Sequence, residues 1–571
     1  MFISSIIINK KILGILAASS AAFGIIFLRL LYLQIHCGDY FINRSQKNFI
    51  RYSTIDSPRG SIRDVNGNLL ATNRPVTTVY WQGTGNAVLS DAQLKLLQAI
   101  EKNTGVQLTA DNRLDAIALH EKKKKKIMLV ADIDFGVLSK LVEAFPNHEN
   151  IIIDTKFKRF YPYHAYASHV IGYLGNVSML ANGKLGLEKL LNEDLAGKKG
   201  SVQNVVNSAG QCISQVELEK ASMGNDVHTT INIDIQLLCE KIFPEQHTGS
   251  LILLNPADGA VVALVSRPHF DPNIFLDPIT HETWQALQEK NTFLNRAFDA
   301  SYPSGSTFKL VTISAALEHG LIEQDSVWNC KGYTLFGKRK YWCARRAGHG
   351  EISIKKAVAE SCNTLFFEIG KKIDIDILAE YAHKFGLGKK TNIIFPEKIG
   401  LIPNREWKFN YKGERWWPGE TLSVTIGQSF LLVTPIQIAC MIASIFTGYL
   451  VAPRLLVNEP VMCTPLDIKP ETITFLKKSM KSVVKSGTGR SVRKVKDITI
   501  YAKTSTAQTS DISKRKLGEQ YLEHGWFVGH FQYKEHDPLV VVILVEHVGA
   551  AQVATTIAKN FLIEYKKYNE K

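Results

Sequence analysis

A single long apolar stretch near the N-terminus places the first constraint on this chain. Leu13–Leu28 holds sixteen residues without a charge, and the apolar pattern resumes after Arg29. A membrane-spanning helix needs roughly 20 apolar residues. Residues 12–33 reach that length if the Arg29 side chain extends to the far interface. No later stretch is comparable, so the sequence predicts one membrane helix followed by a long extramembrane portion.

Two lysines, Lys10 and Lys11, precede the apolar stretch. Because basic residues favour the cytoplasmic side, they predict a cytoplasmic tail at 1–11, an anchor at 12–35 and a remainder outside the cytoplasm. The alternative is a cleaved signal peptide that uses the small residues Ala17–Ala22. The helical pattern continues past those residues, which favours an uncleaved anchor.

Composition excludes several classes of protein. The chain has 571 residues, 45% of them hydrophobic and 21% charged, which is typical of two or three globular domains and excludes wholesale disorder. Lys and Arg exceed Asp and Glu by 68 to 53, but the excess is diffuse. The one dense run, Lys122–Lys126, has no aromatic residues within it and predicts a solvated surface, with no nucleic-acid partner. The net positive charge suits work beside anionic lipid and polymer.

Apolar patterning predicts the fold of the C-terminal portion. Its predicted elements are strands at Ser250–Pro256 and Ala260–Val265, helices over most of 306–445, strands at Ile498–Lys503, Trp526–Gln532 and Leu539–Val545, and a helix at Ala551–Tyr565. Strands at both ends with helices between them predict an α+β domain whose terminal segments share one sheet. Nearer the N-terminus, Asp64–Gly67 predicts a tight hairpin turn.

The first chemical motif is Ser306-Thr-Phe-Lys309, which precedes an amphipathic helix. Ser306 and Lys309 are three positions apart and therefore share a helix face. A serine hydroxyl becomes a good nucleophile when a base removes its proton, and an unprotonated lysine amine is such a base. Taken alone, the motif also fits the start of a surface helix.

Two further motifs follow in the chain. Ser361-Cys-Asn363 carries a hydroxyl and an amide that can both point into a cleft, although either residue would also serve as a helix N-cap. Lys503-Thr-Ser-Thr506, at the end of a predicted strand, can bind a carboxylate while the strand pairs with an extended peptide. The alternative is that these residues form an ordinary charged edge strand with no ligand. Ser361 lies 55 positions after Ser306, and Lys503 lies 142 positions after Ser361.

In this order the three motifs resemble the Ser-x-x-Lys, Ser-x-Asn and Lys-Thr-Gly set of penicillin-binding proteins and class A β-lactamases. The whole chain resembles the class B penicillin-binding proteins, and within them the elongation-specific penicillin-binding protein 2 branch. The other stretches that carry the resemblance are Ser57–Gly60, Asp64–Gly67, Arg159–Tyr163, His169–Gly172, Leu185–Glu188, Leu294–Ala297, Ile402–Trp407, Trp416–Gly419, Ile426–Gln428 and Thr434–Gln437.

The resemblance implies an α+β fold with three parts. These are an N-terminal helix in the bacterial inner membrane, an elongated, mostly-β or α+β pedestal at 36–235, and a periplasmic transpeptidase domain at 236–571 with an antiparallel sheet flanked by helices. It also implies the activity of a peptidoglycan D,D-transpeptidase and D-Ala-D-Ala carboxypeptidase that crosslinks stem peptides during elongation and is inhibited by β-lactams. The implied partner is a polytopic glycosyltransferase of the shape, elongation, division and sporulation family.

The resemblance further implies roles for single residues. Ser306 would be the acylated nucleophile and Lys309 its base. Ser361 would relay a proton to the leaving amine, and Asn363 would hold the substrate amide. The remaining roles fall to the third motif: Lys503 and Thr504 would bind the terminal carboxylate, and the backbone N–H groups of Ser306 and Thr506 would form the oxyanion hole.

One departure from the family pattern leaves alternatives open. Position 505 is Ser where the family usually has Gly, and we expect the added Cβ to crowd the ligand groove or alter β-lactam affinity. The alternatives are a non-catalytic scaffold of the elongation machinery, a division-specific class B transpeptidase, and a β-lactam hydrolase or sensor. The long pedestal disfavours the last.

Three potential metal ligands lie between the first two motifs, and a fourth lies inside the second. Cys330, Cys343, His349 and Cys362 fall within 33 residues. Three thiolates and one imidazole would complete a tetrahedral structural zinc site. The alternatives are a Cys330–Cys343 disulfide and unrelated core cysteines. The resemblance to the penicillin-binding protein 2 branch favours zinc, which would brace the loop that carries Ser361 and have no catalytic role.

Overall fold

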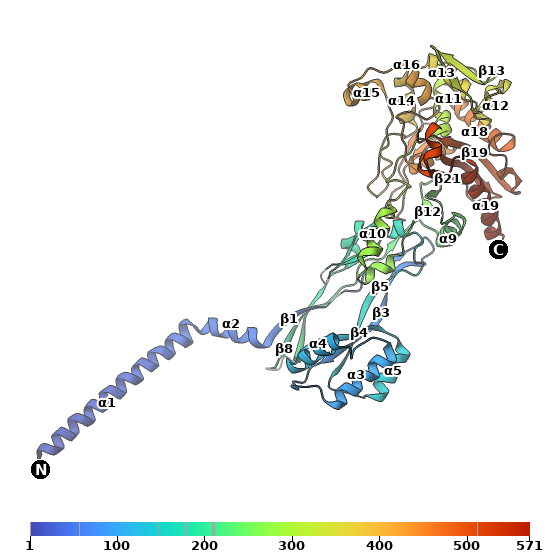
Figure 1. Ribbon diagram of the computed structural model, residues 1–571. Coiled ribbons are helices and arrows are strands. Elements are labelled where there is room, and N and C mark those ends of the chain that lie inside the picture. Colours follow the sequence, from blue (N-terminus) through green and yellow to red (C-terminus); the bar gives the residue numbers. More distant parts are fainter. Residues whose placement is uncertain are drawn as a thin grey trace. The chain divides into compact units, whose positions relative to one another are not determined.

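The computed structural model describes residues 2–55, 57–146, 148–177, 180–207, 212–510 and 512–570. The chain forms two compact units, each built from more than one segment (Figure 1). The first unit comprises 1–58, 74–158 and 196–224, and the second comprises 59–73, 159–195 and 225–571.

The N-terminal segment is helical and apolar. Helix α1 (Phe2–Leu31) continues into a π-helical turn, η1 (Tyr32–His36), and a second helix, α2 (Gly38–Phe49), follows. The stretch Lys10–His36 has a mean hydropathy of 2.0, and none of its most apolar window is buried. In the part of the chain that the structure describes, it is the one helix long and apolar enough to cross a membrane. The stretch encloses 12–35 and is compatible with a single-pass anchor.

Two groups of strands form the first unit. One sheet has the order β1-β8-β9, in which both pairings are antiparallel. In the other, β3 pairs with β4 and β5, and Trp81 packs with Leu96, Leu97 and Leu141 in a shared core. The elements are β1 (Ile50–Ile55), β3 (Leu69–Gln82), α3 (Asp91–Thr104), α4 (Asp111–Lys122), β4 (Lys126–Ile133), α5 (Phe135–Ala144), β5 (Ile151–Phe160), β8 (Gly200–Val206) and β9 (Cys212–Glu219).

Local sequence signals explain where these elements begin and end. Ser90 forms a capping box with Gln93 at the start of α3, and Gly105 ends that helix with a left-handed backbone. The lysine run Lys122–Lys126 lies at the junction of α4 and β4, and all five residues are exposed. The prediction of a solvated surface there is confirmed.

The second unit begins with short segments that support its larger part. The turn predicted at Asp64–Gly67 is confirmed, since Asp64 accepts hydrogen bonds from the backbone N–H groups of Asn66 and Asn68. The short elements are β2 (Ile62–Arg63), α6 (Ser168–Ile171), β6 (Leu174–Val177), β7 (Leu180–Gly183), α7 (Gly186–Leu190), α8 (Asn192–Ala196) and β10 (Val227–His228).

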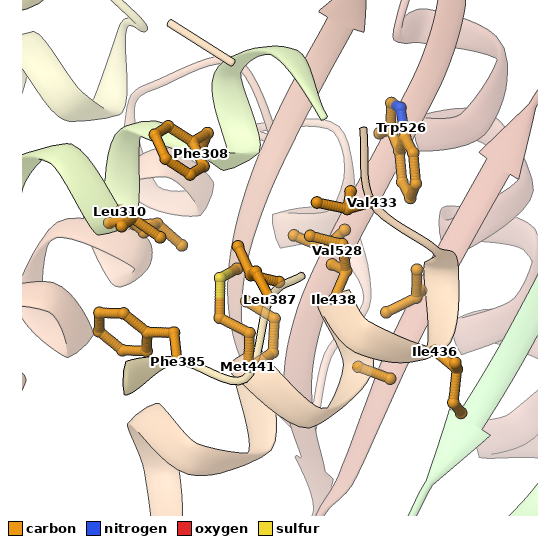
Figure 2. Close-up of a cluster of buried hydrophobic side chains, with 14 of the residues drawn as sticks. Phe308, Leu310, Phe385, Leu387, Val433, Ile436, Ile438, Met441, Trp526 and Val528 are labelled. Carbon is orange, nitrogen blue, oxygen red and sulfur yellow. The ribbon is translucent and has the colours of Figure 1, made fainter. Parts of the chain in front are cut away.

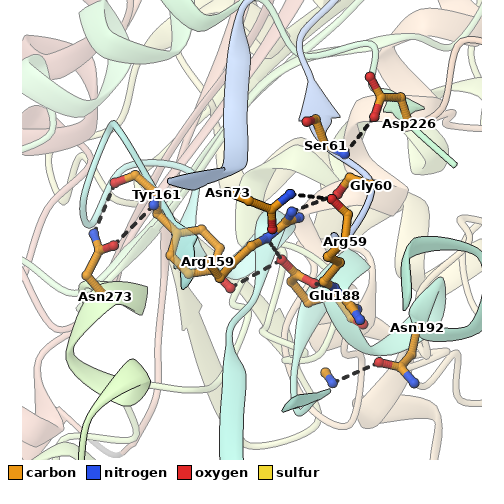
Figure 3. A network of polar contacts seen from close by, with 11 residues as sticks. Arg59, Gly60, Ser61, Asn73, Arg159, Tyr161, Glu188, Asn192, Asp226 and Asn273 are labelled. Carbon is orange, nitrogen blue, oxygen red and sulfur yellow. Dashed lines mark hydrogen bonds and ion pairs between the residues drawn. The ribbon is translucent and has the colours of Figure 1, made fainter. Parts of the chain in front are cut away.

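Within these segments a fully buried carboxylate joins two arginines (Figure 3). Arg59 Nε lies 2.6 Å from Glu188 Oε2, and Arg159 Nε lies 2.7 Å from Glu188 Oε1. Tyr161 donates a hydrogen bond to the same carboxylate, at 3.2 Å. Three of the stretches that carry the family resemblance therefore meet at one buried ion-pair network.

The central sheet of the second unit has the strand order β12-β11-β21-β20-β19, with every neighbouring pair antiparallel. Its strands are β11 (Gly249–Leu254), β12 (Val261–Arg267), β19 (Ile498–Ala507), β20 (His524–Tyr533) and β21 (Leu539–Val545). The first and last segments of this domain share the sheet, as predicted. The prediction of an α+β class is confirmed.

Both faces of this sheet are buried. On β21, Val540, Val542 and Leu544 belong to one apolar core, whereas Val541 and Ile543 belong to the other, as the alternation of side chains along a strand requires. Helices α9 (Ile233–Ile242) and α19 (Gln552–Asn569) contribute to the second core. Helix α17 (Pro435–Thr447) lies in the first core, where its buried face packs with residues of α11 and β20 (Figure 2).

The predicted helical region between 306 and 445 contains strands that the sequence pattern did not indicate. Two small sheets pair β13 with β16 and β14 with β15. The remaining elements are η2 (Pro272–Leu276), α10 (His281–Glu289), η3 (Gly305–Thr307), α11 (Lys309–Glu318), β13 (Val327–Cys330), β14 (Tyr333–Phe336), β15 (Arg339–Trp342), β16 (Gly350–Ser353), α12 (Ile354–Ala359), α13 (Asn363–Lys372), α14 (Ile375–Lys384), α15 (Arg405–Lys412), α16 (Pro418–Val424), β17 (Tyr449–Val451), β18 (Cys463–Pro465), α18 (Pro470–Lys485), η4 (Val492–Lys494), η5 (Ile512–Leu517) and η6 (Glu519–Tyr521).

The buried ion-pair network supports a stability prediction. We expect Glu188→Gln to destabilise the protein by about 3–5 kcal/mol, because it leaves two buried guanidinium groups without a counter-charge. Thermal and urea denaturation of purified protein would measure the loss. Glu193→Gln, at an exposed position of α8, is the matched control. Equal stability of the two variants would contradict the prediction.

Candidate active site

The first motif lies on a tight turn that opens α11. Gly305 has a φ of +51° and starts the short helix η3, on which Ser306 lies half-buried. The backbone N–H of Gly305 donates to the carbonyl of Gly427, at 2.9 Å. Tyr302, just before the turn, donates from its hydroxyl to Glu546. The nucleophile turn, defined as residues 304–307, is therefore held from both sides.

The three motifs meet at the hydroxyl of Ser361. That hydroxyl donates to Ser306 Oγ at 2.8 Å. It accepts from Lys309 Nζ at 3.0 Å and from Lys503 Nζ at 3.2 Å. Lys309 also donates to Asn363 Oδ1, at 2.7 Å. The structure thus brings together Ser306, Lys309, Ser361, Asn363 and Lys503, all five residues predicted to be catalytic.

Both lysines are fully buried, and this burial determines their acid–base behaviour. Burial lowers the pKa of the Lys309 ammonium to about 8, although Cys362 and Cys343 act in the opposite direction. Burial, and then repulsion from Lys309, hold the pKa of Lys503 well below its usual range. Among the polar partners that the structure gives Lys309 there is no carboxylate. Its neutral amine is therefore accessible near physiological pH.

The second motif has an uncommon backbone. Ser361 has a φ of +53°, in the left-handed region that few non-glycine residues occupy. It lies in the turn between α12 and α13, where Cys362 occupies the N-cap position and makes no side-chain cap. The alternative in which Ser361 or Asn363 caps the helix is therefore wrong. Both side chains face Lys309 instead.

The third motif forms one wall of a cleft of about 850 Å³. Alternation along β19 separates Lys503 and Ser505 from Thr504 and Thr506. Thr504 donates from its hydroxyl to Thr488 Oγ1, at 2.6 Å. Thr506 accepts from the backbone N–H of Ala551, at 3.1 Å.

Residues outside the three sequence motifs also line the cleft. Its lining includes Ser306, Ser361, Asn363, Thr504 and Thr506, and in addition Arg345, Glu360, Gln428, Thr488, Arg490 and Gln552. Of these additional residues, Gln428 lies in a stretch that carries the family resemblance. Gln552 begins helix α19, and the others lie on connections whose place beside the cleft depends on tertiary packing.

Ser505 lines the cleft together with Thr504 and Thr506. Ser505 is only 2% exposed, and its hydroxyl donates to the carbonyl of Ser304, at 2.8 Å. The same hydroxyl occupies the position that a Cβ on Gly305 would need. The serine therefore fills space against the nucleophile turn and ties β19 to it. The expected crowding of a ligand stays a prediction, although the hydroxyl end of the side chain is occupied by its packing against Gly305.

The four predicted metal ligands converge beside the second motif. The ligand atoms of Cys330, Cys343, His349 and Cys362 all lie within 4.8 Å of one another. His349 Nδ1 is 3.4 Å from Cys330 Sγ and 3.6 Å from Cys343 Sγ, and the Cys343 and Cys362 sulfurs are 4.0 Å apart. All of the cysteines are free, so the predicted alternative of a Cys330–Cys343 disulfide is not found.

The chemistry of this cluster fits a tetrahedral metal site. Zinc–sulfur bonds of about 2.3 Å place tetrahedral ligand sulfurs about 3.8 Å apart, close to the spacing of the Cys343 and Cys362 sulfurs. The contact between the two sulfurs lowers the pKa of the Cys343 thiol and raises that of Cys362. His349 Nε2 lies 3.6 Å from Glu360 Oε2, in the place where a metal-bound imidazole usually has a carboxylate partner.

Comparisons with known families identify two regions. A model of the penicillin-binding protein transpeptidase domain matches residues 249–562, and a model of the penicillin-binding protein dimerisation domain matches residues 54–229. These matches cover most of the extramembrane chain.

Curated relatives and solved structures agree with these matches. The peptidoglycan D,D-transpeptidase MrdA of Salmonella typhimurium is 31% identical over 78% of this chain and 75% of its own. That of Acinetobacter baumannii is 29% identical over 94% of this chain and 85% of its own. The structure of a complex between penicillin-binding protein PBP2 and MreC from Helicobacter pylori matches with a TM-score of 0.75 and 26% identity, over 91% of this chain and 100% of that chain.

The packing of Ser505 against the nucleophile turn predicts that its side chain stabilises the protein. We expect Ser505→Gly to lower the free energy of unfolding by about 1–3 kcal/mol, since it removes a buried hydrogen bond and leaves an empty space beside Gly305. Ser505→Ala, which keeps the Cβ, should lose less. Differential scanning calorimetry of both variants would measure the difference. A more stable Ser505→Gly variant would contradict this account of the position.

Proposed function

This chain belongs to the class B penicillin-binding proteins, and we propose that it crosslinks peptidoglycan stem peptides during cell elongation as a D,D-transpeptidase. The observation that carries the proposal is the Ser361 hydroxyl, which contacts Ser306 and both buried lysines. The similarity to relatives named peptidoglycan D,D-transpeptidase supports the substrate class.

In the acylation step, neutral Lys309 removes the proton of Ser306 by way of the Ser361 hydroxyl, because Ser361 lies between the two groups. The Ser306 oxygen attacks the carbonyl carbon of the penultimate D-alanine. A carbon–oxygen bond forms and the carbon–nitrogen bond to the terminal D-alanine breaks. The leaving amine receives a proton through Ser361, and free D-alanine departs.

The other motif residues hold the substrate. Asn363, at the mouth of the pocket, binds the peptide amide. Lys503 and Thr504 bind the terminal carboxylate, and the backbone N–H groups of Ser306 and Thr506 stabilise the developing oxyanion. Thr488, which accepts a hydrogen bond from Thr504, orients that hydroxyl and acts as a positioning residue.

The acyl-enzyme is resolved by a second peptide. Its amine nitrogen attacks the ester carbonyl, the bond to Ser306 Oγ breaks, and the amine proton passes to Ser306 by way of the same relay. The product is a crosslink. Water in place of the amine gives D-Ala-D-Ala carboxypeptidase activity. A β-lactam acylates Ser306 in the same way, and its opened ring keeps the leaving nitrogen attached.

We propose that the apolar helix anchors the chain in the inner membrane with 1–11 in the cytoplasm, and that the pedestal at 36–235 and the transpeptidase domain at 236–571 are periplasmic. Lys10 and Lys11 on the N-terminal side of the anchor support this orientation. The proposed partner is a polytopic glycosyltransferase of the shape, elongation, division and sporulation family. A relative solved as part of a peptidoglycan synthase complex, 28% identical over 98% of this chain and 99% of its own, supports this partner.

We also propose that Cys330, Cys343, His349 and Cys362 hold a structural zinc ion. The four ligand atoms leave no open coordination position, so the ion would cross-link the chain and take no part in the reaction. Cys362 lies between Ser361 and Asn363, and holding it in place would fix both catalytic side chains.

A non-catalytic scaffold is disfavoured because Ser505 removes no catalytic contact. The direct test of the enzymatic function is covalent labelling with a fluorescent penicillin. We expect the full-length protein to be labelled and Ser306→Ala to lose the label completely, because the substitution removes the hydroxyl that contacts Ser361. Ser139→Ala, an exposed serine of α5, should label normally. Persistent labelling of Ser306→Ala would refute the assignment of the nucleophile.

The low pKa of Lys309 predicts the pH dependence of acylation. The neutral amine is the base, so the rate should be small well below a pKa of about 8 and rise to a plateau above it. Rapid-quench labelling between about pH 6 and pH 10 would measure the profile. Lys309→Arg keeps the charge and cannot act as a base, so it should remain inactive at every pH. A rate that does not change across this range would contradict the role of Lys309.

The metal proposal makes a separate prediction. Elemental analysis should find about one zinc per chain. His349→Ala should reduce that content, lower the melting temperature and slow acylation without abolishing it. The control is His536→Ala, at an exposed histidine that is distant in sequence from the four proposed ligands. Zinc-free protein of unchanged activity and stability would contradict the proposal.

A further inference from the structure

A strongly basic groove lies on the second unit, outside the catalytic cleft. It has a volume of about 500 Å³. Its cations come from α12, α18 and η4, and we call it the cationic groove; they are Lys355, Lys478, Lys481, Lys485 and Arg493. All five are exposed, and the groove's other wall is the start of β19, at Ile498–Ile500. Its lining among the described residues includes no aspartate or glutamate.

The sequence around this groove is strongly basic. Residues 477–496 contain eight lysines and arginines and no acidic residue. None of the five groove cations forms an ion pair with a carboxylate of the described residues. Lys481 Nζ lies 5.7 Å from the centre of the Tyr501 ring, and Arg493 donates to the carbonyl of Lys485. The positive excess that looks diffuse along the chain is thus concentrated here, and such a concave, uncompensated surface attracts anions.

The groove adjoins the catalytic cleft. Lys485, the last residue of α18, lines the groove, whereas the next three residues, Ser486–Thr488, line the cleft. Arg490 lines the cleft, and Arg493 lines the groove. The end of α18 is therefore a wall shared by both hollows, and Thr488 joins it to β19 through the hydrogen bond from Thr504.

The order of residues along β19 gives the groove a direction relative to the reaction. In the proposed function, Thr506 marks the oxyanion side and Lys503 with Thr504 marks the terminal carboxylate. Ile498–Ile500 continue the strand beyond that carboxylate, on the side from which D-alanine leaves. The attacking amine must enter where the leaving amine departed, so a second peptide approaches from this side.

We propose that the cationic groove binds carboxylates of the acceptor stem peptide, so that this protein selects acceptors that carry free acidic groups. The inference rests on the proposed function and adds the chemistry of the second substrate. β19 is the last strand of its sheet, so its outer backbone groups have no partner strand in the described structure. An extended peptide can pair with such an edge, which favours a peptide over a lipid phosphate as the ligand.

The test compares two acceptors in a transpeptidation assay with full-length protein in detergent. The donor is a synthetic D-alanyl thioester, and the acceptors are an amine-bearing peptide with two free carboxylates and the same peptide with both amidated. The groove variant is Lys478→Glu with Lys481→Glu. The control variant is Lys102→Glu with Lys122→Glu, which makes the same charge change at exposed positions of the first unit. Penicillin labelling is measured on every sample.

We expect the groove variant to lose crosslinking to the acidic acceptor by about five- to tenfold relative to hydrolysis, since two exposed charges are reversed. Crosslinking to the amidated acceptor and penicillin labelling should stay within about twofold of the control variant. Added salt should reduce the advantage of the acidic acceptor in the unmodified protein.

Three results would overturn the inference. Equal crosslinking by the groove and control variants would show that the groove binds no acceptor. An equal loss with both acceptors would show that carboxylates are not recognised. Weaker binding of the groove variant to phosphatidylglycerol vesicles, with crosslinking unchanged, would assign the groove to anionic lipid. Failure of the unmodified protein to take the penicillin label would instead refute the proposed function, on which the inference depends.

Discussion

The hydroxyl of Ser361 accepts hydrogen bonds from two buried lysines and donates one to Ser306, and the other features of the site depend on this arrangement. One lysine comes from the first turn of α11 and the other from the edge strand β19. Their positive charges repel each other, and burial disfavours both charges further. Two lysine side chains can share one hydroxyl only where the surrounding fold holds them, so the site requires a rigid scaffold.

The two apolar cores supply that rigidity. Phe308 and Leu310, on either side of Lys309, are fully buried in the core that contains α17 (Figure 2). Ala502, next to Lys503, is buried in the core on the other face of the sheet. Each lysine is therefore fixed by apolar neighbours in sequence, and neither can move to water without exposing them. Cys362, next to Ser361, is also fully buried, and its sulfur lies 4.0 Å from that of Cys343.

Residue 505 shows how a local departure from a motif can be absorbed by its surroundings. Ser505 is almost fully buried, although it belongs to the lining of the cleft. Here the hydroxyl faces the nucleophile turn, where Gly305 has no side chain and the Ser304 carbonyl needs a donor. Compared with a glycine, the serine restricts the backbone of β19, and its hydroxyl adds a hydrogen bond that joins the third motif to the first.

The sequence by itself determined the α+β class and the single apolar helix, because these follow from apolar periodicity, and its short motifs named the residues that the structure brings together around Ser361. It could not determine the small strands between 327 and 353, since four-residue segments have too little periodicity to identify. Nor could it determine the direction of the Ser505 side chain, the hydrogen bond from Thr504 to Thr488, or the meeting of Lys355 with Lys478, Lys481 and Arg493 in one groove. These depend on contacts between residues far apart in the chain, and only the tertiary structure decides which of them become neighbours.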